Sequence, residues 1–247
     1  MKHLDLTLPS PAENLACDEV LLDWCENGGG EEIIRFWESA ETFVVVGYTN
    51  KIATEVNVAA CKAQGIPILR RCSGGGTVLQ GAGCLNYALV LRIAENSPLA
   101  GISGANQFIM ERNRAAVESL HKTIHHQSST VNLTVCGHTD LAICGRKFSG
   151  NSQRRKKDFL LFHGTFLLNF DFTLVSEFLE MPLRQPHYRE SRTHCDFLTN
   201  LNLSGAEVKT ALAKSWGVND ELKNPPLEKI SALAREKYAT REWNFKF

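Results

Sequence analysis

The sequence of 247 residues lacks a long hydrophobic run, a net charge and any pair of cysteines at C-x-x-C spacing. Apolar stretches such as 43–46 are interrupted by charge or glycine well before the roughly 20 residues that a membrane-spanning helix needs. The first ten residues include Asp5 and no apolar core of a secretion signal. These absences predict a cytoplasmic protein without a membrane partner.

The cysteines are too sparse for a disulfide framework, because disulfide-stapled domains are short, secreted and far denser in cysteine. The closest spacings are the C-x7-C pairs Cys17/Cys25 and Cys136/Cys144, which do not match a zinc site. We therefore expect reduced thiols, most of them small residues of the core, and no metal held by protein side chains.

Charge is balanced, with 27 Lys and Arg against 27 Asp and Glu. A dedicated nucleic-acid binder usually carries a basic domain, so the sequence predicts no nucleic-acid partner. One basic segment is the exception and contains Arg146, Lys147, Arg154, Arg155, Lys156 and Lys157. This segment has two interpretations, a solvated loop or hairpin tip and a docking surface for phosphate or an acidic partner.

Helical and extended segments alternate irregularly along the chain. Apolar spacing, caps and turn residues predict helices over 11–25, 55–64, 106–124, 174–179, 206–216 and 227–238. They predict strands over 33–37, 43–48, 66–71, 86–93, 140–148 and 160–170. We expect the first two strands to pair, and the last two to form a hairpin around the basic segment as a long polar loop.

This order shows no regular βαβ rhythm, which favours an α+β fold with a mixed β-sheet flanked by helices. No internal repeat or low-complexity tract divides the chain. We therefore expect one catalytic domain over 1–247, mostly helical after about 172.

A glycine triplet follows the strand predicted at 66–71, in the segment Arg70, Arg71, Cys72, Ser73, Gly74, Gly75, Gly76, Thr77 and Val78. Glycines allow a ligand to approach backbone N–H groups, and guanidinium and hydroxyl groups donate hydrogen bonds, so the segment predicts an anion site. It matches neither the Walker A motif nor G-x-G-x-x-G. A tight turn or bulge is the alternative.

Two further polar segments stand within predicted strands. In the first, 140–153, strand alternation predicts Lys147 and Ser149 on one face and Phe148 on the other, a surface lysine being the alternative. In the second, His163-Gly164-Thr165 interrupts an apolar run. Glycine there permits close ligand approach, and a hydrogen-bonded core histidine is the alternative.

Together the three segments resemble, in order and spacing, the consecutive motifs of lipoate-protein ligases, within the superfamily of biotin and lipoate ligases and octanoyltransferases. Weaker matches at 14–19 and 242–245 extend the resemblance over nearly the whole chain. The resemblance implies a class II synthetase-like fold and ATP-dependent formation of lipoyl-AMP from lipoate or octanoate. The acyl group then passes to a lysine of a lipoyl-domain or H-protein type acceptor.

By the same resemblance, Lys147 would be the catalytic residue and place its ammonium against carboxylate and α-phosphate oxygens. Asp140 would contact adenine or ribose, His163 and Thr165 would line the floor near the acyl chain, and Mg²⁺ would neutralise phosphates. The implied substrate-binding residues are Arg70, Ser73, Gly74, Gly75, Gly76, Thr77, Val78, Asp140, Ser149, Gly150, His163, Gly164 and Thr165.

The sequence departs from the ligases in two places. Residues 80–86 replace a His-Asp-x-Gly-Asn loop, and the sequence stops at Phe247, where ligases continue into a small accessory domain. We therefore expect either a separate accessory subunit or a reaction that skips adenylation.

The second of these is an octanoyltransferase that takes octanoyl from acyl carrier protein through a cysteine thioester. Cys136, four residues before Asp140, and Cys144, three before Lys147, are the candidate nucleophiles, because a nearby ammonium would stabilise a thiolate. The alternative, which we favour, is that both are buried strand residues. A third hypothesis is a non-catalytic protein that binds lipoate or lipoyl-AMP. The ligase is the leading hypothesis.

Overall fold

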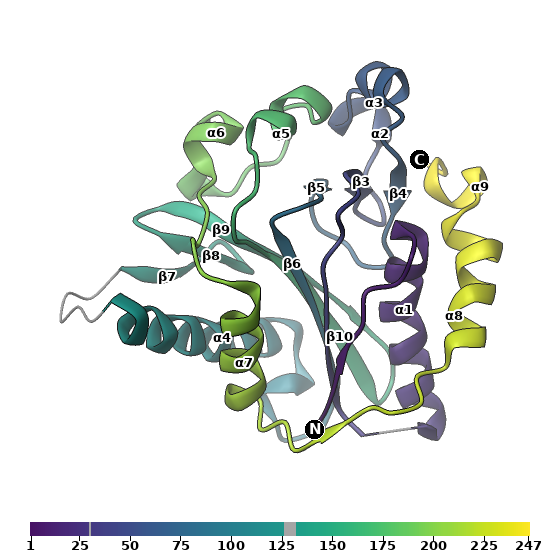
Figure 1. Ribbon diagram of the computed structural model, residues 1–247, viewed down its shortest axis with the longest axis vertical. Helices are drawn as coiled ribbons and strands as arrows, with labels where there is room; N and C mark the ends of the chain where they lie inside the picture. Colours follow the sequence, from purple (N-terminus) through teal and green to yellow (C-terminus); the bar gives the residue numbers. More distant parts are fainter. Residues whose placement is uncertain (30, 126–131) are drawn as a thin grey trace.

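The computed structural model describes residues 1–29, 31–125 and 132–247. Its larger sheet contains β1 (Lys2–Asp5), β2 (Ile33–Trp37), β6 (Cys84–Arg92), β7 (Leu133–Cys136), β8 (Asp140–Ile143), β9 (Arg146–Arg155), β10 (Phe159–Leu167) and β11 (Asp220–Glu221). They lie in the order β11-β1-β2-β6-β10-β9-β8-β7. Figure 1 labels β6 to β10 of this sheet. β1 is parallel to β11 and β2, and the other neighbours are antiparallel. The sheet is therefore mixed, as predicted.

A smaller sheet contains β3 (Phe43–Val46), β4 (Ile68–Arg70) and β5 (Val78–Gln80), in the order β4-β3-β5. The predicted pairing of the first two apolar strands is therefore wrong, because β2 joins the large sheet and β3 the small one. Both strands are buried along their whole length. A strand buried on both faces needs a sheet that other elements cover on each side. An isolated hairpin of these two strands would leave their side chains exposed.

The helices are α1 (Pro11–Trp24), α2 (Ile52–Glu55), α3 (Val58–Gln64), α4 (Ile102–His125), α5 (Thr173–Phe178), α6 (His194–Phe197), α7 (Gly205–Ser215), α8 (Leu227–Leu233) and α9 (Arg241–Asn244). Short π-helical turns extend α1 over Cys25–Gly29 and α8 over Ala234–Tyr238, and 3₁₀ turns occur at Pro98–Ala100 and His187–Arg189. None of the described helices combines the length and the apolar character that crossing a bilayer requires. The predicted helices are present, with their ends shifted by a few residues.

Helix ends follow the local sequence signals. At the start of α1, Ser10 Oγ accepts the Glu13 backbone N–H at 3.2 Å, and Glu13 Oε2 accepts the Ser10 N–H at 3.1 Å. This capping box satisfies donors that the first helical turn leaves free, and Pro11 occupies a position where no N–H is needed. α3 ends at Gly65, whose φ of 68° places it in the left-handed region.

The large sheet separates two hydrophobic cores. α4 and α7 cover one side, called here the α4 face, and α1 and α8 cover the other, the α1 face (Figure 1). Alternate residues of one strand supply both cores: Tyr87 and Leu89 of β6 point to the α4 face, and Ala88 and Val90 to the α1 face. This alternation assigns each side chain of the sheet to one face.

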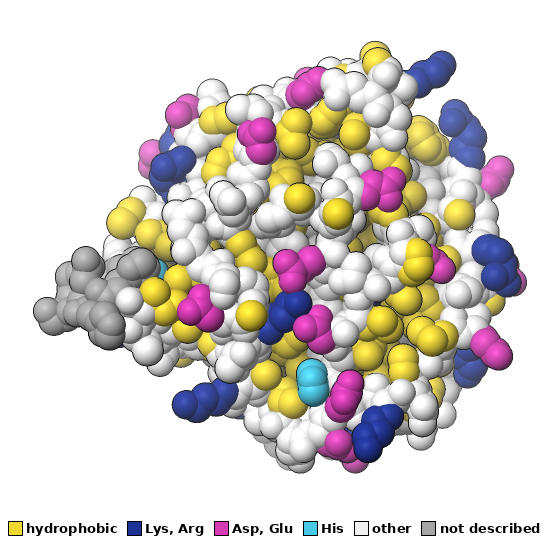
Figure 2. Space-filling view, viewed as in Figure 1, with side chains coloured by type: hydrophobic (Ala, Val, Ile, Leu, Met, Phe, Trp, Pro, Cys, Tyr) yellow, Lys and Arg dark blue, Asp and Glu magenta, His cyan; other side chains and the backbone are white. Residues whose placement is uncertain are grey.

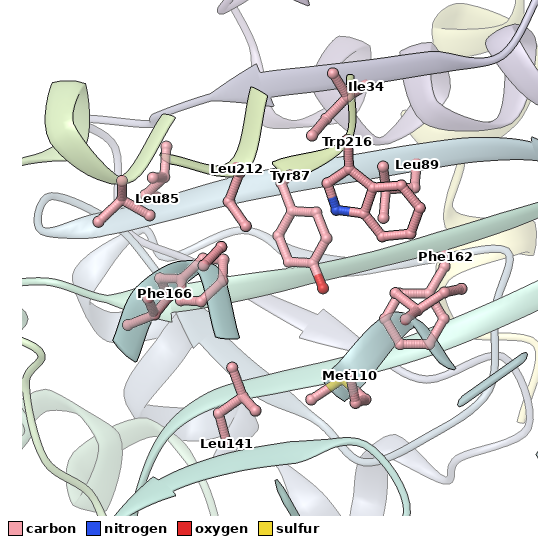
Figure 3. Packing of buried hydrophobic residues seen from close by; sticks show 14 of the residues in the cluster. Ile34, Leu85, Tyr87, Leu89, Met110, Leu141, Phe162, Phe166, Leu212 and Trp216 are labelled. Atoms are coloured by element: carbon pink, nitrogen blue, oxygen red, sulfur yellow. The ribbon is translucent and has the colours of Figure 1, made fainter. Parts of the chain in front are cut away.

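One polar chain crosses the α4-face core. Trp216 Nε1 donates to Asn113 Oδ1 at 2.8 Å, and Asn113 Nδ2 donates to the Tyr87 hydroxyl at 2.9 Å. Figure 3 shows the Trp216 ring and the Tyr87 hydroxyl inside this cluster. Because the buried polar groups bond to one another, they fix the position of the Tyr87 hydroxyl within the core.

The hairpin predicted around a long basic loop has a different form. β8 ends at Ile143, and Cys144 and Gly145, with φ of 48° and 73°, turn the chain into β9. Two left-handed residues in succession match the twist of a tight hairpin. β9 then continues through Arg155, so part of the basic segment lies within a strand.

Charged side chains of both signs are interspersed over the face shown in Figure 2. This distribution agrees with the balanced composition, 27 basic against 27 acidic residues.

Candidate active site

The register of the large sheet places residues from separate motifs in one row. Trp37 pairs with Asn86, Asn86 with Thr165, Thr165 with Gly150, Gly150 with Asp140, and Asp140 with Cys136. Directly paired residues of antiparallel strands present their side chains on the same face, here the α1 face. Thr165, Gly150 and Asp140, predicted from different segments, therefore lie side by side.

Lys147 lies beside this row. Its Nζ is 2.8 Å from Asp140 Oδ1, and the two side chains are 23% and 14% exposed. A Cβ atom at Gly150 would be 2.7 Å from Lys147 Nζ, so glycine at 150 makes room for the ammonium. The Tyr188 hydroxyl donates to the other Asp140 oxygen at 2.7 Å. A fixed, partly solvent-accessible cation results.

Ser149 does not share a face with Lys147, so that prediction is wrong. The pairing of β8 and β9 shifts at a bulge, where Lys147 pairs with Ala142 and Ser149 with Leu141. Leu141 belongs to the α4-face core, and Ser149 Oγ accepts a hydrogen bond there from Asn151 Nδ2 at 3.2 Å. A shift of one residue reverses the face of every later side chain, which simple alternation does not anticipate.

The glycine loop, Ser73–Gly76, is held through its carbonyl groups. Arg71 Nη2 donates to Gly74 O at 2.5 Å and to Gly76 O at 2.8 Å, and Ser152 Oγ donates to Gly74 O at 2.9 Å. Burial lowers the pKa of Arg71 to about 10, and the guanidinium remains charged at neutral pH. No hydrogen bond among the described residues uses the N–H groups of Gly74, Gly75 or Gly76, which leaves them for an anion.

Gly47 is a residue of this site that sequence reasoning missed. A Cβ there would lie 2.0 Å from Gly75 O, so the chain after β3 packs directly on the loop. The Tyr48 N–H also donates to Ser73 O at 2.8 Å. The turn sequence Gly47-Tyr48-Thr49-Asn50 after an apolar strand was the available signal.

Arg70 is fully buried and organises two distant segments. Its Nη1 donates to the backbone oxygens of Gly47 at 2.8 Å and Asn50 at 2.9 Å, and its Nε donates to Asn244 O at 3.2 Å. Asn244 Oδ1 accepts the Arg70 backbone N–H at 2.9 Å. Arg70 Nη2 is buried with no partner among the described residues. The whole guanidinium is buried, and its carbon lies 5.4 Å from the centre of the Phe247 ring. Arg70 therefore holds these segments together and does not present a donor to solvent.

Thr77 and Val78 leave the loop toward the small sheet. The Thr77 hydroxyl and Asn50 Nδ2 both donate to Glu55 Oε2. Val78 is half-buried against the α1-face core. The Glu55 carboxylate, which the sequence did not single out, therefore ties the end of the loop to α2.

His163 lies in the row next to Thr165 on the α1 face, where it pairs with Ser152 of β9. Its Nδ1 is 3.0 Å from Asp18 Oδ2, and its Nε2 is 2.5 Å from Ser73 Oγ. His163 thus connects α1 with the first residue of the glycine loop. Asp18 is the hydrogen-bond partner of His163 that sequence reasoning missed. Residues 14–19 were considered only as part of the family resemblance.

Thr165 lies in a polar floor between two buried amides. Gln80 Nε2 donates to Thr165 Oγ1 at 2.6 Å, and Thr165 Oγ1 donates to Asn86 Oδ1 at 2.6 Å. Gln80 Oε1 and Asn86 Nδ2 are buried without partners among the described residues. Gln80 and Asn86 come from the segment that departs from the ligase pattern.

Gly164 pairs with Tyr87 on one side and Asn151 on the other, and a side chain at this position would lie on the opposite, α4 face. A Cβ there would lie 1.7 Å from Asn151 Oδ1, which accepts the Tyr87 hydroxyl at 2.6 Å. The close neighbour that requires glycine at 164 is therefore the Asn151 side chain.

All cysteines of the chain are free thiols. The five buried ones, as expected of small core residues, are Cys17, Cys25, Cys61, Cys72 and Cys84. The expectation that both candidate nucleophiles are buried strand residues is wrong. Cys136 is half-buried because β7 is an edge strand, and Cys144 is exposed in the β8–β9 turn.

The basic segment is largely engaged in internal contacts. Arg146 donates to Leu198 O at 2.7 Å, Arg154 to Cys72 O at 2.9 Å and Arg155 to Leu99 O at 2.7 Å. Lys156 Nζ is 2.5 Å from Asp23 Oδ1, whereas Lys157 is exposed. The interpretation as a freely solvated loop is therefore wrong for these arginines.

Within the part of the chain that the structure describes, no three His, Cys, Asp or Glu side chains are grouped as a metal site. A divalent ion here would need ligands from a bound phosphate compound.

Comparisons with known proteins identify the family. The model of the lipoyl protein ligase A/B catalytic domain matches residues 10–216. Octanoyltransferase LipM of Anoxybacillus flavithermus is 30% identical over 96% of this chain and 95% of its own length. A probable lipoate-protein ligase A of Mycoplasma pneumoniae is 32% identical over 73% of this chain and 50% of its own length.

Solved structures agree on the fold. A bi-partite lipoate protein ligase of Thermoplasma acidophilum, studied together with its E2 lipoyl domain, superimposes with a TM-score of 0.79 at 23% identity, covering 99% of this chain and 95% of that one. A lipoate-protein ligase A bound with ATP gives 0.73 at 23% identity, covering 99% and 98%. This chain therefore has the α+β fold of lipoate ligases and is an enzyme of the lipoyl protein ligase A/B catalytic domain family.

Proposed function

We propose that the chain is an ATP-dependent lipoate-protein ligase, which forms lipoyl-AMP and transfers the lipoyl or octanoyl group to a lysine of a lipoyl-domain acceptor. The observation that carries this proposal is the fixed Lys147 ammonium, 2.8 Å from Asp140 and beside Gly150. Gly150 and Ser152 share a face two residues apart on β9, and Ser152 contacts the glycine loop. These two strand positions are about 7 Å apart, so the residue beside the ammonium and the residue that contacts the loop are neighbours on one face.

In the first step, a carboxylate oxygen of lipoate attacks the α-phosphorus of ATP, and the bond to pyrophosphate breaks. We assign the N–H groups of the glycine loop to the phosphate oxygens. We assign to Arg70 the support of the segment after β3 that packs on this loop. Lys147 stabilises the charge that develops between the carboxylate and the α-phosphate. Mg²⁺ would neutralise the phosphates, held mainly by the nucleotide itself because the described residues offer no cluster of ligands.

In the second step, the neutral amine of the acceptor lysine attacks the acyl carbonyl, AMP leaves, and an amide forms. Lys147 lies where it can also stabilise the oxyanion of this addition. Thr165 and His163 would line the acyl chain. The lipoyl-domain acceptor and an accessory subunit that assists adenylation are part of this proposal, and so is its place in the cytoplasm.

A second candidate is an octanoyltransferase that uses a cysteine thioester. It is favoured by the full-length match to octanoyltransferase LipM, including 28% identity to the Geobacillus kaustophilus protein over 99% of this chain and 98% of that protein. Cys136 also lies at the end of the site row, paired with Asp140. Its Sγ contacts Thr134 Oγ1 at 3.3 Å, whereas the Lys147 ammonium is engaged by Asp140. The Asp140 carboxylate thus lies between the Lys147 ammonium and this thiol.

Intact-mass analysis of the protein and an apo lipoyl domain separates the two candidates. With ATP, Mg²⁺ and lipoate, the ligase adds a lipoyl group to the acceptor. With octanoyl acyl carrier protein and no ATP, it leaves the acceptor unmodified. Octanoylation without ATP, with an enzyme adduct that Cys136→Ser or Cys144→Ser removes, would instead establish the transferase.

A further inference from the structure

A chain of four buried polar side chains runs from the large sheet through α1 to the glycine loop. Arg35 Nη1 lies 2.6 Å from Asp18 Oδ1, Asp18 Oδ2 lies 3.0 Å from His163 Nδ1, and His163 Nε2 lies 2.5 Å from Ser73 Oγ. These residues are 0%, 2%, 8% and 2% exposed. The reaction proposed above gives no task to Asp18 or Arg35.

Arg35 is anchored before it reaches Asp18. Its Nη2 donates to Asn14 Oδ1 at 2.7 Å and to Leu6 O at 3.0 Å. Asn14 in turn accepts the Leu8 N–H at 3.0 Å, so the guanidinium is fixed to the start of α1. A cation fixed in this way holds the Asp18 carboxylate in one orientation.

The charge of Asp18 decides which ring nitrogen of His163 carries a proton. Burial alone would raise the Asp18 pKa, but the hydrogen bond from His163 and the charge of Arg35 outweigh burial and keep that pKa below its ordinary value. An ionised carboxylate only accepts hydrogen bonds, so His163 must present Nδ1–H to Asp18. In the neutral ring, Nε2 is then an acceptor.

We propose that Asp18 is a positioning residue that fixes His163 in its Nδ1–H tautomer, so that Nε2 accepts the Ser73 hydroxyl and anchors the first residue of the glycine loop. Ser73 Oγ also accepts Arg71 Nε–H at 3.2 Å. The hydroxyl therefore donates once and accepts once, which holds Ser73 in place. The loop N–H groups that follow it are thereby oriented before a ligand arrives.

The order Asp18–His163–Ser73 is also that of a hydrolase triad, in which the serine attacks an acyl group. Ser73 is 2% exposed, and Arg71 lies against its oxygen. An acyl carrier cannot reach Oγ in this geometry. The chain of hydrogen bonds therefore positions the loop, and Ser73 is not the nucleophile.

The ring itself provides the first test. In ¹⁵N NMR spectra of the full-length protein at neutral pH, we expect His163 Nδ1 to carry the proton and Nε2 to be the acceptor. A proton on Nε2 in the wild type, in a neutral or a doubly protonated ring, would overturn the proposal without any variant. Labelling of Ser73 by a fluorophosphonate probe would also overturn it, because that result would make Ser73 a nucleophile.

The second test removes the positioning group. Asp18→Asn is combined with Arg35→Met, because removing one partner alone would leave a buried charge unpaired. We expect the Nδ1–H signature to be lost, the ¹⁵N order parameters of the Gly74–Gly76 amides to fall, and the dissociation constant of ATP to rise about tenfold, as loss of one hydrogen bond predicts. Asp23→Asn, on the same helix but partly exposed, is the matched control and should change none of these.

The tautomer and order-parameter measurements do not depend on the proposed function, whereas the expected loss of ATP affinity rests on it. If the wild type binds no ATP, the ligase proposal fails and the first two measurements still decide the role of Asp18. Unchanged order parameters in the double variant would overturn the positioning role. Ser73→Thr, which retains a hydroxyl, should keep the wild-type order parameters, and Ser73→Ala should lower them.

Discussion

Gly164 and Asn151 face each other across β10 and β9 so closely that a Cβ atom at 164 would lie 1.7 Å from Asn151 Oδ1. The amide cannot move away easily, because Tyr87 donates to it at 2.6 Å and Asn151 Nδ2 donates to Thr139 O at 2.7 Å. We expect Gly164→Ala to lower the free energy of unfolding by about 1–3 kcal/mol through overpacking. Urea denaturation measures the change.

A double-mutant cycle separates this contact from general strain. In a protein that carries Asn151→Gly, Gly164→Ala should lower the free energy of unfolding much less, because the Asn151 amide is absent. Equal costs of Gly164→Ala in both backgrounds would show that the Asn151 amide is not the obstacle.

Lys147 carries the proposed catalysis. Lys147→Ala should reduce kcat for acyl transfer by at least about 10²-fold, the usual loss when one transition-state donor is removed. Lipoate and ATP binding should remain measurable by calorimetry. Lys157→Ala, which changes an exposed lysine ten residues along the chain, is the matched control and should retain wild-type kcat.

Full turnover in Lys147→Ala would contradict the site assignment. If the wild type itself binds lipoate or lipoyl-AMP without any turnover, the third hypothesis, a non-catalytic binding protein, would hold instead.

Tyr188 holds the far oxygen of Asp140. Burial first, and then the Asp140 charge, raises the pKa of the Tyr188 hydroxyl above its ordinary value, so it stays a donor at neutral pH. Tyr188→Phe removes this single hydrogen bond to a charged group, worth about 1.5–3 kcal/mol, and should lower kcat/KM roughly 10-fold or more. Steady-state acyl transfer to a lipoyl domain measures it.

If Tyr188 acts through Asp140, Tyr188→Phe should lower kcat/KM little further in a protein that already carries Asp140→Asn. Additive losses in the double variant would mean that Tyr188 contacts the substrate by itself.

The basic segment offers a test of acceptor docking. Lys157 is exposed, whereas Arg154 donates to Cys72 O beside the glycine loop. If the segment attracts an acidic acceptor, Lys157→Glu should weaken acceptor affinity a few-fold, and the effect should shrink as salt screens the charges. Surface plasmon resonance at several ionic strengths measures both.

Arg154→Glu should behave differently and lower the unfolding temperature, since it removes an internal contact. Unchanged acceptor affinity and salt dependence in Lys157→Glu would count against docking at this segment.

Acid should expose the contribution of Asp18. Because its pKa in the folded state lies below the ordinary value of 3.8, the stabilisation from its ionised form is complete above that value. This contribution is lost as the pH falls through the lower, folded-state pKa. Below pH 3.8, the unfolding free energy of the wild type should therefore fall more steeply than that of the Asp18→Asn, Arg35→Met variant. A difference that is constant with pH would contradict this linkage.

Local signals were sufficient for much of the chain. Ser10 and Glu13 mark the start of α1, and Gly65 marks the end of α3, because caps and left-handed turns depend on neighbouring residues only. The glycine triplet, Lys147 and His163 were also found in the sequence, since their residue types are unusual within apolar surroundings.

The orientation of Ser149 could not be read in the same way. A bulge between β8 and β9 depends on how two strands pair, and that pairing reverses the face of Ser149 relative to Lys147. The pairing of β2 with β6, rather than with β3, is likewise a choice between partners that are distant in sequence. Both predictions failed because they extended a local pattern to a non-local contact.

The sequence by itself determined the family and the fold class and indicated the segments of the candidate site, because these depend on residue types and their order along the chain. Only the tertiary structure decided that Thr165, Gly150 and Asp140 form one row and that Asp18 connects to Ser73 through His163. The hydrogen bond between Asp18 and His163 alone joins residues 145 positions apart. No local propensity specifies such contacts, because the packing of the whole chain selects them.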